Sequence, residues 1–314
     1  MRRYPSKHRP GGYTLAELSI MMGVLAIIGG LAYSMLMSST TLLAKNVSLN
    51  SSNVMVRQAL DRMYADLNQA NRLPTLINDD GSPAGLVGPA AGIVFDRYVG
   101  GPYVVGNPGS GLPASTTTLN LFYSTDPLAN PPDPVPNDVI IMDGKTRALV
   151  SGSTASATLL APSPTPLPNP GRMATVTLAN TLGTYTTPSG SGISWASSTQ
   201  QTAYLVHRQA FVVVPVNGTT GPAELRVYQD AETVTNYNDP SKYVVLTHTI
   251  GTKTVNGLLE HIPFSLVTQD GATYLNIAMR VEDQQYNQRL ATQQANEFNT
   301  FLRIDSLFRP KNIP

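Results

Sequence analysis

A long uncharged stretch near the start of the chain restricts its fold more than any other feature of the sequence. No charged residue occurs from Leu18 through Ala44. Its first part, Leu18 to Met37, has about the 20 residues that an α-helix needs to cross a ~30 Å hydrocarbon core at ~1.5 Å per residue. Residues 1 to 12 carry four basic side chains, and such residues favour the cytoplasmic side of a membrane. We therefore expect a membrane-spanning helix whose amino end stays cytoplasmic and whose following chain is exported.

Two simpler interpretations of this stretch are an ordinary secretory signal peptide and a plain single-span anchor. A signal peptide has an apolar region of roughly 7 to 15 residues followed by a cleavage site of small residues, whereas the run here is longer. A plain anchor accounts for the length but leaves Glu17, at the edge of the run, unexplained. A carboxylate in lipid without a partner costs of the order of a few kcal/mol, so a cationic partner for Glu17 is expected.

A family resemblance supplies that partner. Type IV prepilins and the pseudopilins of type II secretion carry a processing and assembly signal that resembles Gly11-Gly12-Tyr13-Thr14-Leu15-Ala16-Glu17-Leu18. The resemblance implies cleavage by a prepilin peptidase between Gly12 and Tyr13, N-methylation of Tyr13, and subunit assembly through Glu17. The new amino terminus can be cationic and can pair with Glu17 within one subunit or between neighbours. The family usually has Phe at the position of Tyr13 and a large aliphatic residue at that of Ala16.

A second helical pattern follows the apolar stretch. Ser38 to Asn53 is rich in Ser, Thr and Asn, which are poor residues for a helix interior, so fraying is expected there. Beyond it, apolar residues recur at steps of four and three on one helix face, with charged residues largely on the other, until Pro74 ends the pattern. The apolar residues are Val56, Leu60, Met63, Leu67 and Ala70, and the charged ones are Arg57, Asp61, Arg62, Asp66 and Arg72.

If the two patterns form one helix, it runs from Tyr13 to Leu73 and is ~90 Å long. Residues 13–44 would then be its transmembrane and assembly half, and residues 45–73 its amphipathic half, after a leader at 1–12. The remaining residues, 74–314, predict a β-rich globular head with Pro- and Gly-rich loops, because the chain has 25 residues of each type.

Strand-like runs in the head are short and separated by loops. Between Thr75 and Gly192 they are Ile93 to Tyr98, Leu119 to Tyr123, Val139 to Met142, Thr158 to Ala161 and Ala174 to Leu178. The carboxy-terminal third alternates more regularly, as in an antiparallel sheet, in Tyr204 to Val216, Glu224 to Tyr228, Tyr243 to Thr249, Pro263 to Thr268, Thr273 to Val281 and Phe298 to Ile304. Asn217-Gly218 and Asp270-Gly271 predict hairpin turns.

A long helix followed by an antiparallel sheet predicts an α+β fold. This order of elements is that of the pilin-like fold. The J-type minor pseudopilin group is the most similar by length, by the stretch Arg57 to Leu73 and by its large β-rich head. The family signal itself covers only residues 11 to about 40.

The chemistry available to the chain argues against an enzyme. A net charge of +1 with 13% charged residues offers no broad field for nucleic acid, and Cys is absent. The common hydrolase and nucleotide-binding motifs are missing. The four histidines are His8, His207, His248 and His261, and hydrogen-bonded sheet residues are the expectation for the second and third. Asp79 and Asp80 predict an ordinary turn, because they do not match the spacing of a calcium loop, and an oxygen-rich calcium site is the alternative. Trp195 predicts partial burial, with a contact surface as the alternative.

The sequence therefore predicts a non-enzymatic, pilin-like subunit of a type II secretion pseudopilus or type IV pilus, present as a minor component and without a cofactor. Expected partners are a prepilin peptidase and methyltransferase, other pilin or pseudopilin subunits, an inner-membrane assembly platform and the lipid bilayer. The expected location is the inner membrane, with a periplasmic or extracellular head. The alternatives are a membrane-anchored binding module, an adhesin or an enzyme that uses a prepilin-type export signal.

Overall fold

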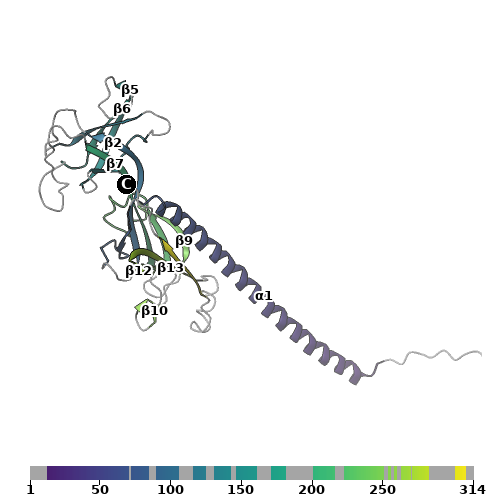
Figure 1. Ribbon diagram of the computed structural model, residues 1–314. Helices are drawn as coiled ribbons and strands as arrows, with labels where there is room; N and C mark the ends of the chain where they lie inside the picture. Colours follow the sequence, from purple (N-terminus) through teal and green to yellow (C-terminus); the bar gives the residue numbers. More distant parts are fainter. Residues whose placement is uncertain are drawn as a thin grey trace, which may run out of the picture.

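The computed structural model consists of one long helix and a large antiparallel β-structure, which is an α+β fold (Figure 1). The helix, α1 (Leu15–Leu67), extends well beyond the head, and the strands lie against its carboxyl half or beyond its carboxyl end. The structure describes residues 13–70, 72–84, 90–105, 116–124, 131–142, 146–160, 171–181, 201–215, 223–250, 254–255, 258–259, 263–269, 271–282 and 301–308.

α1 is continuous through the stretch where fraying was expected. The hydroxyls of Thr40 and Thr41 donate to the carbonyl of Met37, at 3.0 and 2.7 Å, so these side chains bond to the helix backbone. Such bonds back to the preceding turn keep Thr compatible with a helix. The expectation of fraying between Ser38 and Asn53 is therefore wrong for this structure, in which every residue of the stretch is helical.

α1 ends at Leu67, six residues before the expected end at Leu73. The N–H groups of Gln69 and Ala70 donate to carbonyls three residues back, at 3.1 and 2.9 Å, which tightens the last turn. The sheet then takes the following backbone groups, because Gln69 accepts a hydrogen bond from the N–H of Tyr98 at 2.8 Å and Ala70 pairs with Arg97. Pairing with the sheet, rather than Pro74, terminates the helix.

Twelve strands form one sheet in which all pairings are antiparallel. They are β1 (Thr75–Ile77), β2 (Gly92–Val105), β3 (Thr118–Ser124), β4 (Val139–Met142), β5 (Thr146–Leu160), β6 (Gly171–Leu178), β7 (Gln201–Pro215), β8 (Ala223–Tyr228), β9 (Val244–Ile250), β12 (Phe264–Gln269), β13 (Ala272–Glu282) and β14 (Phe301–Phe308). A separate pair consists of β10 (Thr254–Val255) and β11 (Leu258–Leu259).

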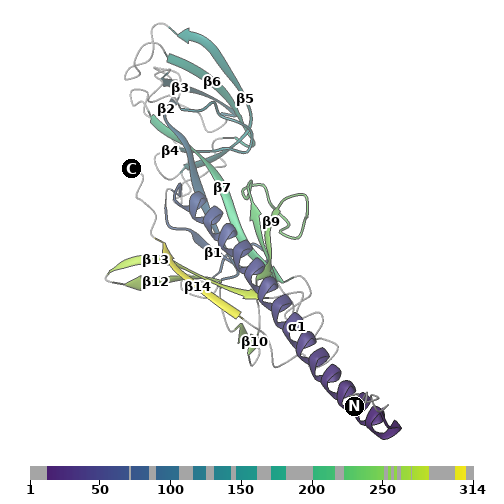
Figure 2. The same cartoon turned by 90° about the vertical axis from the view of Figure 1, so that its right-hand side faces the viewer.

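Six of these strands close into a barrel. The hydrogen-bonded order β2-β3-β6-β5-β4-β7 returns to its start because β7 also pairs with β2. The interior of this barrel lobe is apolar and filled by residues such as Tyr103, Leu121, Ile140, Val176 and Leu205, each at most 1% exposed. Figure 2 shows the barrel at the end of the head farthest from the amino end of α1.

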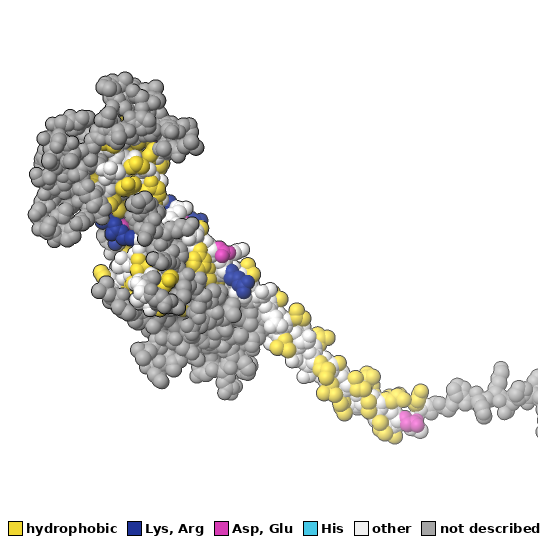
Figure 3. All heavy atoms as spheres, in the orientation of Figure 1, with side chains coloured by type: hydrophobic (Ala, Val, Ile, Leu, Met, Phe, Trp, Pro, Cys, Tyr) yellow, Lys and Arg dark blue, Asp and Glu magenta, His cyan; other side chains and the backbone are white. Residues whose placement is uncertain are grey.

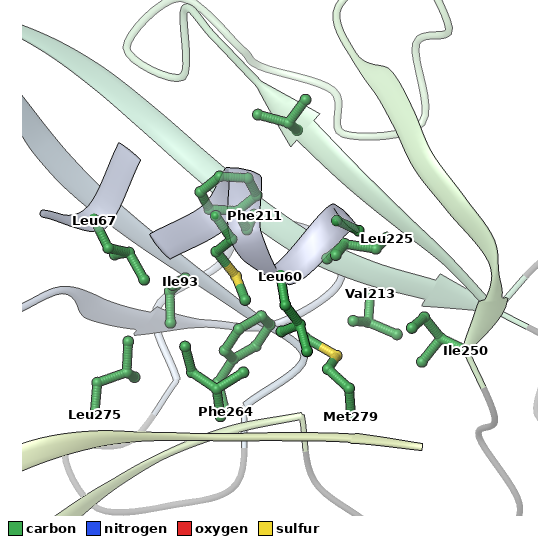
Figure 4. Close-up of a cluster of buried hydrophobic side chains, with 14 of the residues drawn as sticks. Leu60, Leu67, Ile93, Phe211, Val213, Leu225, Ile250, Phe264, Leu275 and Met279 are labelled. Carbon is green, nitrogen blue, oxygen red and sulfur yellow. The ribbon is translucent and has the colours of Figure 1, made fainter. Parts of the chain in front are cut away.

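The other strands form a base lobe that packs on the carboxyl half of α1. β1 pairs with β2, while β8, β9, β13, β12 and β14 extend the sheet beyond β7. Apolar residues of α1, including Leu60, Met63 and Leu67, insert among Phe211, Phe264 and their neighbours (Figure 4). This confirms the predicted apolar stripe of the helix.

β2 and β7 run through both lobes. Ile93 and Phe95 of β2 lie in the core of the base, whereas Tyr103 and Val105 of the same strand lie in the core of the barrel. The register of β2 against β7 shifts twice between Tyr98 and Tyr103, where the strand passes from one lobe to the other. Pro132 packs closely at this shift, since a Cβ on Gly100 would lie 2.4 Å from its Cδ.

The structure confirms most of the predicted strands and corrects two expectations. Val139 to Met142 is a strand with the predicted bounds. Gly100 to Val105, expected as part of a loop, belongs to β2, and β5 begins at Thr146 rather than Thr158. β12 and β13 form the predicted hairpin around Gly271, whose φ is 75°. Asn217-Gly218 and Asp270 lie outside the described residues.

Candidate functional site

The amino-terminal part of α1 is an apolar surface that the head does not cover (Figure 3). Its large hydrophobic side chains are 48 to 86% exposed: Leu15, Leu18, Ile20, Met21, Met22, Val24, Leu25, Ile27, Ile28, Leu31, Tyr33, Met35, Leu36, Met37, Leu42, Leu43, Val47, Val54 and Met55. From Leu15 to Met37 these residues lie all around the helix, so the exposed apolar surface there is a cylinder rather than a stripe. From Ser38 to Asn53 they are separated by Ser, Thr and Asn. A helix of this length and hydropathy near the amino terminus is long and apolar enough to cross a membrane.

Small residues interrupt this cylinder. No atom lies within 4 Å of a Cβ built on Gly23, Gly29 or Gly30. Helices approach one another closely where such residues meet, because no side chain separates their backbones. The three glycines therefore leave room for a second helix on this part of α1.

Glu17 lies in the first turn of α1 and is bonded to the residue that caps the helix. Its Oε2 accepts hydrogen bonds from the backbone N–H of Thr14 at 2.9 Å and from the Thr14 hydroxyl at 3.0 Å. The same hydroxyl accepts a hydrogen bond from the N–H of Glu17 at 3.3 Å, which completes a capping box. Tyr13 comes directly before the cap and is 72% exposed, whereas Gly12 lies outside the described residues.

A second polar site joins α1 to the head. Asp66 is 5% exposed, although the sequence pattern placed it with the charged face of the helix. Its carboxylate accepts a hydrogen bond from Gln209 of β7 at 3.0 Å and lies 3.6 Å from the guanidinium of Arg97 on β2. Arg62, one turn earlier on α1, binds it at 3.3 Å. Asp66 thus faces the sheet, and the expectation that it lies on the solvent side is wrong.

Further ion pairs lie where the barrel meets the base. Arg147 of β5 binds the carboxylate of Asp96 on β2 through both terminal nitrogens, and Asp96 is 5% exposed. Glu232, in the turn after β8, accepts hydrogen bonds from Arg208 at 2.8 Å and from Arg147 at 3.4 Å. Arg147 therefore connects a barrel strand to two elements of the base.

His207 of β7 lies between two carboxylates at this junction. Its Nδ1 is 3.1 Å from Asp138 Oδ1 and its Nε2 is 2.7 Å from Asp230 Oδ1. The hydrogen bond with Asp138 raises the pKa of His207, burial opposes this, and the charges of Asp230 and Asp138 add to the increase. Because both ring nitrogens face carboxylates, neither is directed at a hydroxyl that it could activate, which suits a structural role better than catalysis.

A groove of about 410 Å³ opens beside Asp230. Asn137 from the barrel side and Thr233, Ser241 and Lys242 from the β8–β9 connection line it. Asp230 lines this groove with a side chain that is 45% exposed, so the partner of His207 Nε2 is open to solvent there.

The other residues singled out in the sequence are the remaining histidines, the acids at Asp79 and Asp80, and Trp195. His248 lies in β9 within 3.0 Å of Glu224, so both His207 and His248 are hydrogen-bonded sheet residues, as predicted. Asp80 accepts from the N–H of Ser82 at 2.8 Å and Gly81 has a φ of 83°, which confirms the predicted turn. Within the described ranges, no three His, Asp or Glu side chains cluster as metal ligands. His8, Trp195 and His261 lie outside those ranges.

The buried charges at the junction were not predicted, although one of them leaves a signal in the sequence. Asp96 interrupts the apolar run that begins at Ile93, and an acid inside a buried strand requires a cationic partner. The partner, Arg147, lies 51 positions away and shares no sequence pattern with it.

Comparisons with protein-family models, with curated proteins and with solved structures find no match to this chain.

Proposed function

We propose that this protein is a pilin-like structural subunit, inserted through α1 and assembled with other subunits into a type II secretion pseudopilus or type IV pilus as a minor component. The single observation that carries the proposal is the length over which α1 exposes large apolar side chains. From Leu15 to Met55, α1 rises ~60 Å, about twice a ~30 Å hydrocarbon core. Lipid can cover only half of this surface.

The part beyond the membrane needs a protein partner. If the bilayer covers α1 as far as Met37, then Met55 lies ~27 Å farther along the axis. Leu42, Leu43, Val47, Val54 and Met55 remain 48 to 63% exposed in this part. Exposure of these five apolar side chains to water, within a stretch that is otherwise rich in Ser, Thr and Asn, is unfavourable and indicates an interaction site. The corresponding helices of neighbouring subunits can cover it, whereas a plain anchor leaves it in water.

The capping box supports the proposed role of Glu17. Its carboxylate is bonded to the backbone N–H of Thr14, one residue from the atom that would become the amino terminus after cleavage at Gly12. A charged amino group on Tyr13 would therefore lie close to a carboxylate in the same subunit or in a neighbour. In this proposal a prepilin peptidase and methyltransferase processes the chain, an inner-membrane platform assembles it, and the head lies in the periplasm or outside the cell.

Mass spectrometry of the amino terminus tests the processing step. Co-expression with a prepilin peptidase should yield a chain that begins with N-methyl-Tyr13, and Gly12→Val should block the cleavage. Gly11→Ala, at the neighbouring glycine, is the matched control and should be processed. A functional protein that keeps residues 1 to 12 would contradict the proposal and favour an anchored binding module.

Cysteine cross-linking tests assembly separately. Because the chain has no Cys, a single introduced Cys gives an unambiguous signal. Met55→Cys should cross-link between subunits in membranes that contain the assembly machinery and not in dilute detergent. Adding Glu17→Gln should reduce this cross-linking several-fold while the head stays folded, whereas adding Ser19→Ala, two residues away, should not. Cross-linking that is equally strong with Glu17→Gln would show that the carboxylate is dispensable.

A further inference from the structure

The imidazole of His207 connects the two lobes of the head. Its Nδ1 contacts Asp138, the residue before strand β4 of the barrel, and its Nε2 contacts Asp230, in the turn after strand β8 of the base. β7, which carries His207, belongs to both lobes, so these two contacts are made from the strand that joins them. Loss of either contact would loosen one lobe from this strand.

The two carboxylates require a doubly protonated ring. An ionised carboxylate only accepts hydrogen bonds, and a neutral imidazole has one N–H donor and one nitrogen with a lone pair. The imidazolium ion can donate to Asp138 and to Asp230 together. When the ring loses a proton, one of its nitrogens faces a carboxylate with its lone pair, and that contact becomes repulsive.

The described residues near the site include three other cations. Lys242 lines the groove beside Asp230, and the other two are paired with acids. Arg97 lies across from His207 in the β2–β7 ladder and pairs with Asp66. Arg208, the next residue on β7, binds Glu232 at 2.8 Å. His207 is therefore the cation placed between Asp138 and Asp230.

The two acids differ in their access to water. The side chain of Asp138 is 1% exposed, and its Oδ2 also accepts a hydrogen bond from the N–H of Val135 at 2.9 Å. The side chain of Asp230 is 45% exposed and lines the groove of about 410 Å³. A buried carboxylate without its donor loses more free energy than one that water can hydrate, so the neutral ring should keep its N–H on Nδ1, toward Asp138.

We propose that His207 is a proton-operated latch between the barrel and the β8–β9 connection. With the ring charged, the latch is closed and Asp230 is held against β7. With the ring neutral, the contact with Asp138 remains, Asp230 is released to water, and the connection from Asp230 to Tyr243 gains freedom at the groove. The latch acts within one head and does not depend on assembly of the subunit.

NMR of the full-length chain in detergent micelles, with ¹³C,¹⁵N-labelled histidine, tests the latch. The His207 signals, assigned by their loss in His207→Gln, should titrate with a midpoint above the usual ~6.5. The neutral ring should show the Nδ1–H tautomer. Backbone amides between Asp230 and Tyr243 should change with the same midpoint.

Two variants in the same connection sharpen the test. Asp230→Asn removes the exposed acid and should lower the His207 midpoint while the Nδ1–H tautomer persists. Asp239→Asn is the matched control, because Asp239 bonds to Ser241 and does not contact His207. It should leave the midpoint unchanged. An ordinary midpoint in the wild type, an Nε2–H tautomer of its neutral ring, or amides that do not follow the titration would each overturn the proposal, even if a variant fails to fold.

Discussion

Asp66 shows how a single buried charge positions the helix on the head. It lies in the last turn of α1, where the helix dipole disfavours a negative charge. The cations Arg62 and Arg97, together with the amide of Gln209, offset this cost and draw the helix end toward β2 and β7. The angle at which α1 leaves the head is therefore set by a polar contact as well as by the apolar core.

Removal of this acid should destabilise the head. Asp66→Ala leaves Arg97 and Gln209 without their shared acceptor, and we expect a loss of about 1–3 kcal/mol in the free energy of unfolding. Urea unfolding of the full-length chain in detergent, followed by circular dichroism, measures this loss. Asp61→Ala, at an exposed position on the same helix, should change stability by less than ~0.5 kcal/mol. Equal effects of the two substitutions would argue against the contact.

At the scale of the element, α1 performs two tasks with two kinds of surface. From Val56 onward, the residues that face the sheet are buried. Up to and including Met55, the large apolar side chains described in the structure are exposed. The change occurs within one turn, so residues of the same type on the two sides of this turn serve different tasks.

Two methionines allow a matched comparison of these tasks. Met63 is fully buried, and Met63→Ala should cost about 2–5 kcal/mol of head stability by creating a cavity. Met55 is 49% exposed, and Met55→Ala should change stability by less than ~0.5 kcal/mol but weaken assembly. Chemical unfolding and subunit cross-linking measure the two effects. A stability loss at Met55 as large as that at Met63 would mean that the head, and not a neighbouring subunit, covers this position.

Elements with a local signal could be predicted from the sequence, and those that depend on distant partners could not. The sequences of β4, β8 and β13 are themselves rich in apolar or β-branched residues, so each strand could be recognised locally. The first half of β5 reads Thr-Arg-Ala-Leu-Val-Ser-Gly-Ser and lacks such a pattern beyond Val150. Its strand character therefore depends on pairing with β4 up to Leu149 and with β6 from Val150 onward. Closure of the barrel depends on contacts of β7 with β2 and β4, which no local pattern encodes.

The same limit applies to the site residues. Glu17 and Tyr13 could be proposed because they lie four positions apart within one short stretch of sequence that resembles a family signal. Their roles in processing and assembly stay predictions. Asp66 was assigned to the wrong helix face because helical periodicity sorts residues by polarity and cannot anticipate a cation supplied by another strand. His207 was predicted as a bonded sheet residue, but its two acids come from segments 69 and 23 positions away.

At the scale of the whole molecule, the two lobes are not independent domains. β2 contributes side chains to both cores, and so does β7. Unfolding of the barrel would therefore remove the strands that support the base. Cooperative unfolding of the two lobes is expected on this ground.

A substitution in the barrel should consequently weaken the base. Leu121→Ala, at a fully buried barrel position, should cost about 2–5 kcal/mol. Hydrogen exchange should show reduced protection by the same free energy for amides of the barrel and for those of α1 between Val56 and Leu67. Reduced protection in the barrel alone would show that the lobes unfold separately.

The pH dependence of stability follows from His207. Because its pKa is raised in the folded state, the contribution of its contacts is complete below ~6.5, the pKa of an unfolded histidine, and is lost as the pH rises through the folded-state pKa. The difference in Tm between the wild type and His207→Gln should thus be largest near about pH 6 and should shrink at higher pH. Thermal unfolding at a series of pH values measures it, and His248→Gln, with a 60% exposed ring, is the control. A constant difference would contradict the assignment.

The path of β2 and β7 also has a mechanical consequence. A load applied at the far end of the barrel and resisted at α1 passes along β2 and β7, each of which is a continuous strand through both lobes. Where those strands lie side by side, the load acts parallel to them. The strands can then slide past one another only if their hydrogen bonds break together rather than one at a time. A head built in this way can carry tension from the far end of the barrel to α1 without a weak seam between the lobes.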